Sequence, residues 1–266
     1  MAGKNARTSA GGSYSNAWRT VSKIILRPGI SMMMGLDFAG QEHIPAQGPV
    51  ILAANHLSYM DIFAVARFAD RAGRYPVFLA KSTLFKIPVI GPVIGWLGQL
   101  PVYRGQADAA LVLKQAAQLV AETNSCVIFY PEATCTRDPD LWPMVAKTGV
   151  ARLALESGVP VVPIAHWGAQ RILPYGKFVP KFLPRTTVRL VAGPPVDLSE
   201  FEGQPLTNPL LRAATDKIMT DVAGLLGGLR GEQPPAEFYH PAVARRQQRQ
   251  DLRALQEADD QGTPAP

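Results

Sequence analysis

The sequence has few cysteines and no metal-binding spacing. Only two occur in 266 residues, Cys126 and Cys135, nine positions apart and without a CxxC partner. A disulfide framework and a zinc site both require more cysteines at closer, repeated spacings. We therefore expect neither of them, and we expect no metal site of another kind.

Long apolar runs are also missing. A membrane-spanning helix needs roughly 18 uninterrupted apolar residues. The nearest approach, IPVIGPVIGWLGQLP from Ile87, is interrupted by three prolines. The N-terminus carries Lys4 and Arg7 but continues with the polar TSAGGSYSN, which is unlike a signal peptide. These patterns predict a cytoplasmic protein that is either soluble or lies on a membrane surface.

Acidic residues are scarce in the first part of the chain. Residues 1–36 contain no acid, and residues 1–104 hold 11 Lys or Arg against 4 Asp or Glu, a net charge of +7. The rest holds 16 against 17, a net charge of −1. A one-sided basic face suits a phosphorylated metabolite, nucleic acid or an anionic membrane. We expect no nucleic acid partner, because the chain lacks interleaved aromatic residues and a recognisable nucleic-acid module.

Short apolar runs alternate with segments of helical periodicity. Strands are predicted at residues 49–54, 76–80, 99–103, 125–130, 159–164 and 186–191. Helices are predicted near residues 60–72, 106–122, 147–157 and 208–227. Such alternation predicts an α/β fold, with a single domain whose largely parallel central sheet is flanked by helices.

The composition divides the chain into four parts. We expect residues 1–16, rich in Gly and Ser, to form a flexible tail, and residues 17–36 to form a basic amphipathic region. Residues 37–230 form the globular domain, and residues 231–266 turn to Pro, Gln and charge, which is typical of a polar tail.

The basic amphipathic region begins with a short helix that should end at Pro28-Gly29. Its apolar side carries Trp18, and its basic side carries Arg19, Lys23 and Arg27 at four-residue intervals. This helix can lie in a membrane interface, with Trp18 in the lipid and the cations on headgroups. The alternative, which periodicity alone favours, is a first helix that packs on the domain's own core.

The stretch NHLSYMD contains a candidate acid/base pair. Asn55 and His56 follow the predicted strand 49–54, at the carboxyl end where functional groups of open α/β sheets gather. If His56 lies in the turn and Asp61 in the first helical turn, the two side chains can meet. A carboxylate on one imidazole nitrogen supports the cation that forms when the other nitrogen takes a proton. The alternative is a polar turn, because HxxxxD spacings are common by chance.

Three other predicted strands also end in polar or charged residues. QLPVYRG ends in Arg104, VIFYPEATCTRD contains Glu132, Thr134 and Arg137, and VVPIAHWG contains His166. Arg104 and Arg137, together with Lys81, can clamp a phosphate, since guanidinium groups match its geometry with paired donors. Taken singly, each residue also has an ordinary explanation as a surface charge, a helix cap or a buried histidine.

Together these stretches resemble the four ordered sequence blocks of the glycerolipid acyltransferase family, which includes the PlsC-type 1-acyl-glycerol-3-phosphate acyltransferases. The blocks are NHLSYMD (55–61), GQLPVYRG (98–105), FYPEATCTR (129–137) and VVPIAHWG (161–168). Connecting segments are similar as well: KSTLFKIPVIG (81–91) and KTGVARLALESGVPVVPI (147–164). The resemblance covers about residues 35–200, and four blocks in order are far more specific than one.

The resemblance implies acyl transfer from a thioester, acyl-CoA or acyl-acyl-carrier protein, to a hydroxyl of a glycerol phosphate. It implies no tightly bound cofactor. His56 would be the general base and Asp61 its orienting partner. Arg104 and Lys81 would hold the acceptor phosphate in a pocket that Glu132 and Thr134 order, with Arg137 as a helper. Amides near Asn55 and the Val162-Pro163-Ile164 turn would stabilise the oxyanion.

One block departs from the family pattern. The family usually has Glu-Gly-Thr-Arg, whereas this chain has Glu132-Ala133-Thr134 followed by Cys135-Thr136-Arg137. Alanine is harmless at position 133 if the backbone there is helical, and strained if the backbone needs a positive φ. The displaced arginine leaves the role of Arg137 open.

The acceptor and the class of protein both have alternatives. Lysophosphatidic acid is the expected acceptor, with glycerol 3-phosphate or a glycolipid hydroxyl as rivals. A serine hydrolase would need a GxSxG motif, which the chain lacks. A non-catalytic membrane-binding module would not need His56, Asp61, Glu132 and Arg104 together.

An amphiphilic acceptor changes how two apolar segments are interpreted. The acceptor favours an anionic membrane surface as partner for residues 17–36, at the cytoplasmic face, with the protein peripheral or monotopic. The apolar IPVIGPVIGWLG segment either lines a groove for the acyl chain or packs in the core.

Overall fold

The computed structural model describes residues 20, 24, 27–102, 120, 124–247, 249, 250 and 252. For four of these residues only the backbone is described: Lys81, Ile90, Pro101 and Val102. The predicted flexible tail, most of the predicted basic helix and the predicted helix near 106–122 lie outside the described residues.

A seven-stranded sheet forms the centre of the domain, in the order β1-β7-β6-β2-β5-β3-β4. The strands are β1 (Gly35–Ala39), β2 (Val50–Ala54), β3 (Pro76–Lys81), β4 (Leu100–Val102), β5 (Cys126–Phe129), β6 (Val161–Trp167) and β7 (Thr187–Ala192). All neighbours pair in parallel except β6 and β7, which are antiparallel. The predicted α/β fold with a largely parallel sheet is therefore confirmed.

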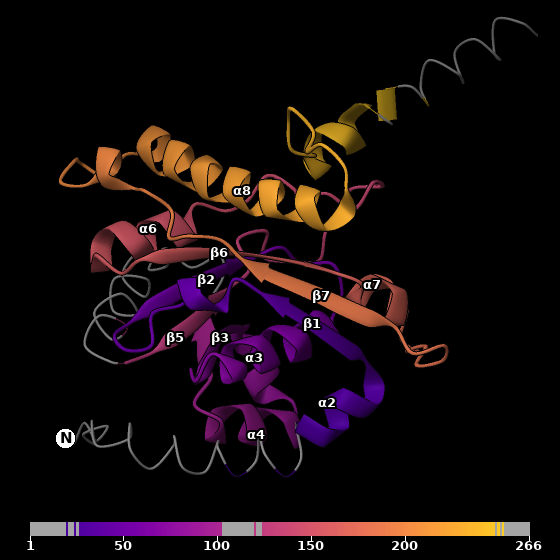
Figure 1. Ribbon diagram of the computed structural model, residues 1–266. Helices are drawn as coiled ribbons and strands as arrows, with labels where there is room; N and C mark the ends of the chain where they lie inside the picture. Colours follow the sequence, from indigo (N-terminus) through magenta and orange to yellow (C-terminus); the bar gives the residue numbers. More distant parts are fainter. Residues whose placement is uncertain are drawn as a thin grey trace, which may run out of the picture.

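Helices cover both faces of this sheet (Figure 1). The α-helices are α2 (Arg27–Met33), α3 (Asp61–Arg71), α4 (Ile90–Trp96), α6 (Gly149–Ser157), α7 (Ala169–Ile172) and α8 (Asn208–Arg230). Short 3-10 helices are η2 (Gln41–His43), η3 (Ser82–Lys86) and η4 (Ser199–Phe201). In Figure 1, α6 and α8 lie above the sheet, and α2, α3 and α4 lie below it. None of the helices in the described ranges is both long enough and apolar enough to cross a bilayer.

Strand β2 shows how the sequence builds the two halves of the core. All five of its residues are buried, so alternate side chains must face opposite sides of the sheet. Val50 and Leu52 pack in the cluster that contains Phe68 of α3, whereas Ile51 and Ala53 pack in the cluster that contains Ile218 of α8. A strand buried on both faces reads as a continuous apolar run, which is why VILAA was recognisable from the sequence.

Strand β1 was not predicted from the sequence. Its segment, GLDFA, carries a charged residue and a glycine, and its burial pattern is mixed. It pairs in parallel with β7, which places Gly35 opposite Thr187 and Ala39 opposite Val191. This edge strand forms because β7 offers it a partner, which local sequence does not reveal.

Pro28 and Gly29, where the basic helix was expected to end, lie in the first turn of another helix, and the expected helix itself lies mostly outside the described residues. Helix α2 spans Arg27–Met33 and includes both residues. Proline is tolerated in a first helical turn, where its missing N–H has no intrahelical acceptor to lose. Ile30 and Met34 are buried, so the α2 region packs on the domain.

The apolar IPVIGPVIGWLG segment forms the approach to α4 and the helix itself. Val89 is 77% exposed and Trp96 is 55% exposed, and neither joins the core clusters. Plain core packing therefore does not account for the apolar character of this segment.

Candidate active site

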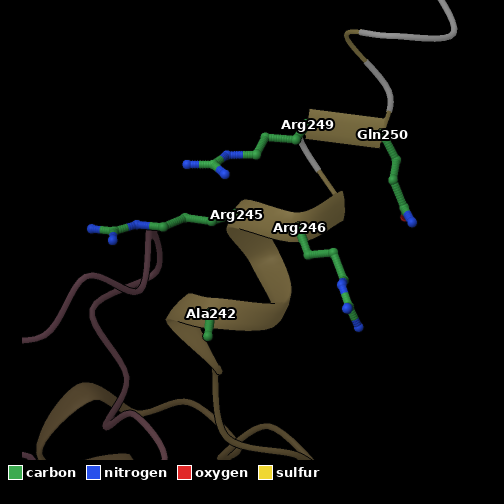
Figure 2. Close-up of a pocket in the computed structure, with 5 residues that line it drawn as sticks. All are labelled: Ala242, Arg245, Arg246, Arg249 and Gln250. Atoms are coloured by element: carbon green, nitrogen blue, oxygen red, sulfur yellow. The ribbon is translucent and has the colours of Figure 1, made fainter.

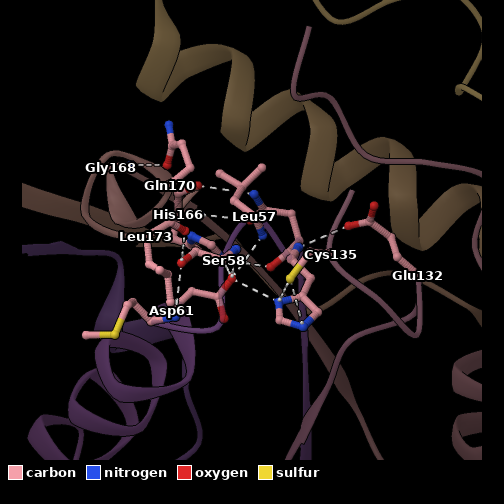
Figure 3. A network of polar contacts seen from close by, with 12 residues as sticks. Leu57, Ser58, Asp61, Glu132, Cys135, His166, Gly168, Gln170 and Leu173 are labelled. Atoms are coloured by element: carbon pink, nitrogen blue, oxygen red, sulfur yellow. Dashed lines mark hydrogen bonds and ion pairs between the residues drawn. The ribbon is translucent and has the colours of Figure 1, made fainter. Parts of the chain in front are cut away.

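His56 and Asp61 meet directly beyond the carboxyl end of β2. Figure 3 shows Asp61 in the network of polar contacts around this pair. His56 Nδ1 lies 2.9 Å from Asp61 Oδ2. The same oxygen accepts hydrogen bonds from the backbone N–H groups of Leu57, at 2.9 Å, and Ser58, at 3.0 Å. Asp61 is the first residue of α3, so the turn between strand and helix wraps around its carboxylate.

Asp61 keeps its charge although it is fully buried. Burial alone would raise its pKa, but the neighbouring His56 and His166 and the hydrogen bonds from His56 and the Ser58 amide lower the pKa below its ordinary value. An ionised Asp61 is an acceptor only, so His56 Nδ1 carries a proton toward it. The Nε2 nitrogen of His56 is then free to accept a proton from another group.

The segment after β5 holds the backbone of His56 from both sides. Glu132 Oε1 accepts from the His56 N–H at 3.0 Å, and the Thr136 N–H donates to the His56 carbonyl at 2.7 Å. The second carboxyl oxygen of Glu132 accepts from the Met144 N–H at 2.9 Å. Glu132 is buried, and its role in the structure is to fix the position of His56.

Ala133 adopts the conformation that would strain an alanine. Its φ is 61°, in the left-handed region that favours glycine. The Ala133 N–H donates to the Tyr130 carbonyl at 2.9 Å, which closes a tight turn before Cys135. The turn aims Glu132 and Thr136 at His56, and the chain keeps it at some cost in backbone strain.

Three side chains surround the imidazole ring of His56. The ring of Tyr130 stacks on it with centroids 4.3 Å apart, and the ring of Tyr59 approaches it edge-on at 6.3 Å. Cys135 Sγ lies 3.6 Å from Nε2. Burial, followed by the charges of Asp61 and Glu132, raises the pKa of the Cys135 thiol to about 12. The thiol is therefore protonated at neutral pH.

His166 is a member of the site whose role the sequence left undecided. Its Nε2 lies 3.3 Å from Asp61 Oδ2 and 2.6 Å from the Asn55 carbonyl. The Asn55 side chain in turn donates to the His166 carbonyl and accepts from the His166 N–H. In the sequence, the only signal for these hydrogen bonds was a histidine and an asparagine at the ends of two predicted strands.

The structure describes the side chains of only some of the predicted phosphate-binding residues. Arg104 and the side chain of Lys81 lie outside the described part of the chain, although the Lys81 backbone ends β3. Thr134 is half-buried, and Arg137 is exposed. Arg137 lies close enough to Tyr59 for its charge to oppose the rise in the pKa of that phenol, which burial causes. Arg137 is thus a described cation beside the site.

The Val162-Pro163-Ile164 segment is not a turn at the site, as the sequence analysis expected. It lies inside β6, where Val162 and Ile164 are buried in the core. Pro163 has no N–H, and its carbonyl accepts from the Gly193 N–H at 3.0 Å. Amides paired within a central strand cannot reach a thioester carbonyl, so these residues shape the sheet instead.

A hollow of about 450 Å³ lies on the C-terminal segment, away from the His56 network. Its lining residues are Ala242, Arg245, Arg246, Arg249 and Gln250. In Figure 2 the side chains of Arg245 and Arg249 extend to the same side of the segment, whereas that of Arg246 points downward. Nearby, the Val145 N–H donates to the Tyr239 carbonyl, which fastens the start of this segment to the domain.

Within the described ranges, no group of three or more His, Cys, Asp or Glu side chains is arranged to hold a metal ion. The chemistry of the site is that of a histidine and a carboxylate, held at the ends of parallel strands. A histidine paired with a buried carboxylate has the chemistry that a general base requires.

Comparison with known proteins places this site in a family. The family model described as Acyltransferase matches residues 35–167, which is half of the 266-residue chain. The chain belongs to this family. The matched range contains His56, Asp61, Glu132 and His166.

Curated relatives carry a more specific name. A chloroplastic 1-acyl-sn-glycerol-3-phosphate acyltransferase of Brassica napus is 35% identical over 53% of this chain and 39% of its own length. The chloroplastic enzyme of that name from Arabidopsis thaliana is 30% identical over 63% of this chain and 45% of its own length. The chain thus matches less than half the length of these two relatives.

A solved structure shares the fold. The crystal structure of the 1-acyl-sn-glycerophosphate (LPA) acyltransferase, PlsC, from Thermotoga maritima has a TM-score of 0.61 and covers 83% of this chain and 84% of its own. The sequence identity is 24%, so this similarity concerns the fold alone.

Proposed function

We propose that the chain transfers a fatty acyl group from an acyl thioester to the free hydroxyl of 1-acyl-glycerol 3-phosphate, which yields phosphatidic acid for phospholipid synthesis. The observation that carries the proposal is the 2.9 Å contact between His56 Nδ1 and the buried carboxylate of Asp61. Membership of the Acyltransferase family and the names of the relatives support the choice of reaction.

In this mechanism His56 Nε2 accepts the proton of the acceptor hydroxyl as its oxygen attacks the thioester carbonyl. The tetrahedral intermediate then expels the thiolate, and His56 returns the proton to it. The carboxylate of Asp61 stabilises the imidazolium that exists between the two steps. Holding the hydroxyl and the thioester in line would supply much of the rate acceleration.

The acceptor phosphate would be held by cations near the ring of Tyr59. Arg104 and Lys81 are our candidates from the sequence, and the exposed Arg137 is the described candidate. Glu132 is unsuited to bind a phosphate, because both of its carboxyl oxygens already accept backbone N–H groups. We assign Glu132 to positioning His56.

The acyl donor in this proposal is acyl-CoA or acyl-acyl-carrier protein, used as co-substrate, with no tightly bound cofactor. Glycerol 3-phosphate itself and a glycolipid hydroxyl are the alternative acceptors. These two acceptors and 1-acyl-glycerol 3-phosphate all carry a hydroxyl that His56 can deprotonate. The choice among them therefore depends on the groups that bind the rest of the acceptor.

We also propose that the enzyme works at the cytoplasmic face of an anionic membrane, as a peripheral or monotopic protein. The basic residues of the 17–36 region would contact lipid headgroups, with Trp18 in the interface. Deleting residues 1–36 would also remove packing of the domain, because Ile30 and Met34 are buried and β1 starts at Gly35. A deletion of residues 1–26 leaves these contacts intact and should lower sedimentation with anionic vesicles.

The direct test measures acyl transfer from palmitoyl-CoA to lysophosphatidic acid by the intact chain and by His56→Ala. We expect the variant to lose about 10³-fold or more in rate, as for other general bases that act in both half-steps. His240→Ala is the matched control, since His240 is exposed. Equal rates for the intact chain and His56→Ala would refute the general-base assignment. Transfer to glycerol 3-phosphate in the same assay ranks the acceptors.

A further inference from the structure

The loop between α7 and β7 exposes several large apolar side chains. It lies at the outer end of β7 in Figure 1, and its sequence from Pro174 is PYGKFVPKFLPR. Phe178 is 91% exposed, Leu183 is 87% exposed and Val179 is 78% exposed. Single exposed apolar residues are ordinary, but a cluster on one loop is typical of an interaction surface.

The same loop region is basic. Its exposed cations are Arg171, Lys177, Lys181 and Arg185. The sequence contains no Asp or Glu between Glu156 and Asp197. A surface that combines exposed aromatic and aliphatic side chains with cations alone is complementary to the interface of an anionic bilayer.

The loop continues into the surface of α2. The Arg185 guanidinium donates to the Ser31 carbonyl at 2.6 Å and to the Met34 carbonyl at 3.2 Å. Met32, between these two residues in sequence, is 80% exposed. The apolar tip of α2 and the loop are therefore tied together, next to the N-terminal region for which we propose membrane contact.

The root of the loop touches the active site. The Ser58 hydroxyl donates to the Leu173 carbonyl at 2.7 Å, and the ring of Tyr175 lies 6.4 Å from the ring of Tyr59. Tyr59 in turn lies beside the imidazole of His56. The exposed loop thus begins where an acceptor would approach the general base.

We propose that residues 174–185, together with Met32, form a bilayer-docking surface that sets the mouth of the His56 site against anionic lipid. Phe178, Val179 and Leu183 would enter the interface, while the lysines meet lipid phosphates. The inference rests on the proposed function, because it explains how an amphiphilic acceptor reaches His56 without leaving the membrane.

The test compares Phe178→Ser/Leu183→Ser with the intact chain in sedimentation with vesicles of phosphatidylcholine and phosphatidylglycerol. We expect the variant's partition coefficient to fall at least ~10-fold, since two interfacial anchors are lost. Val243→Ser/Leu252→Ser is the matched control, because it removes two apolar side chains that are 61% and 54% exposed elsewhere. Equal vesicle binding by the intact chain and the loop variant would overturn the proposal.

A charge variant tests the contribution of the lysines to the docking surface. Lys177→Gln/Lys181→Gln should lose the preference for phosphatidylglycerol-containing vesicles over pure phosphatidylcholine, and added salt should weaken the binding of the intact chain. If light scattering shows instead that the loop variant dissociates a dimer while its vesicle binding is unchanged, the surface is a protein interface and the proposal is wrong.

Acyl-transfer assays with two acceptors test the docking surface separately from the proposed function. The loop variant should transfer acyl groups slowly to long-chain lysophosphatidic acid in vesicles. With a short-chain, water-soluble lysophosphatidic acid its rate should stay within about twofold of the intact chain, since the His56 site is unaltered. Failure of the intact chain with both acceptors refutes the proposed function, whereas equal rates of loop variant and intact chain on vesicles refute the docking surface.

Discussion

His166 Nε2 lies 3.3 Å from Asp61 Oδ2, the same oxygen that His56 Nδ1 contacts at 2.9 Å. The Asn55 carbonyl, 2.6 Å away, is a second acceptor for that nitrogen. Between two acceptors Nε2 must carry the proton, and Nδ1 has no hydrogen-bond partner in the described part of the chain. Burial lowers the pKa of His166, so a neutral imidazole supports the carboxylate that pairs with His56.

We predict that His166→Phe lowers kcat for acyl transfer about 10-fold with little change in KM. An aromatic ring remains at this position, but the carboxylate of Asp61 loses one donor that holds it in place. His166→Gln restores an N–H donor and should recover part of the loss. The pH–rate profile should also shift, because His166 contributes to the low pKa of the Asp61 carboxyl that pairs with His56.

His240→Phe is the control for the His166 variants, since His240 is exposed. A His166→Phe enzyme with an unchanged pH–rate profile and a rate that falls only with the amount of folded protein would show a purely structural role.

Ala133→Gly should stabilise the protein by about 0.5–1 kcal/mol. The left-handed φ of 61° costs an alanine roughly 1–2 kcal/mol, and glycine's larger unfolded-state entropy offsets part of this gain. Denaturant unfolding measures the change. Ala213→Gly, at an exposed position inside α8, should instead destabilise by about 1 kcal/mol. Destabilisation by both variants would contradict a strained turn at position 133.

Glu132 should make stability fall as pH rises. Burial raises its pKa from the ordinary value of 4.5 to about 8, although hydrogen bonds from the Met144 and His56 amides oppose the rise. Between these two pH values the folded state holds a proton that the unfolded state releases, so ionisation favours unfolding. The free energy of unfolding should lose on the order of 5 kcal/mol across this window.

The measurement compares unfolding of the intact chain and Glu132→Gln from pH 5 to pH 9, with the exposed Glu237→Gln as control. The stability advantage of the intact chain over Glu132→Gln should shrink as pH rises. An advantage that grows with pH would mean that Glu132 is ionised in the folded state.

Cys135→Ala should keep kcat within about threefold of the intact chain. The thiol lies 3.6 Å from His56 Nε2, but a pKa of about 12 leaves almost no thiolate to attack a thioester. Cys126→Ala, which removes another buried thiol, is the matched control. A loss of about 10³-fold in Cys135→Ala, with an acyl group found on Cys135 by mass spectrometry, would establish a covalent mechanism instead.

The sequence by itself determined the part of this site that is close together in the chain, the pairing of His56 with Asp61. An apolar run buried on both faces predicts β2, and five-residue spacing across a strand–helix turn predicts that His56 can meet Asp61. Six of the seven strands could be predicted, because each coincides with an apolar run in the sequence. Strand β1 could not, because it depends on an edge offered by β7.

Only the tertiary structure decided what holds the pair in place. Glu132 contacts His56 across 76 positions of sequence, and His166 contacts Asn55 across 111. These contacts exist because β2 lies between β5 and β6, which brings three strand ends to one edge of the sheet. Apolar periodicity specifies which residues are buried, but it does not specify strand order. The partners of the general base, the left-handed turn at Ala133 and the exposed loop beside Tyr59 therefore became visible only in the folded chain.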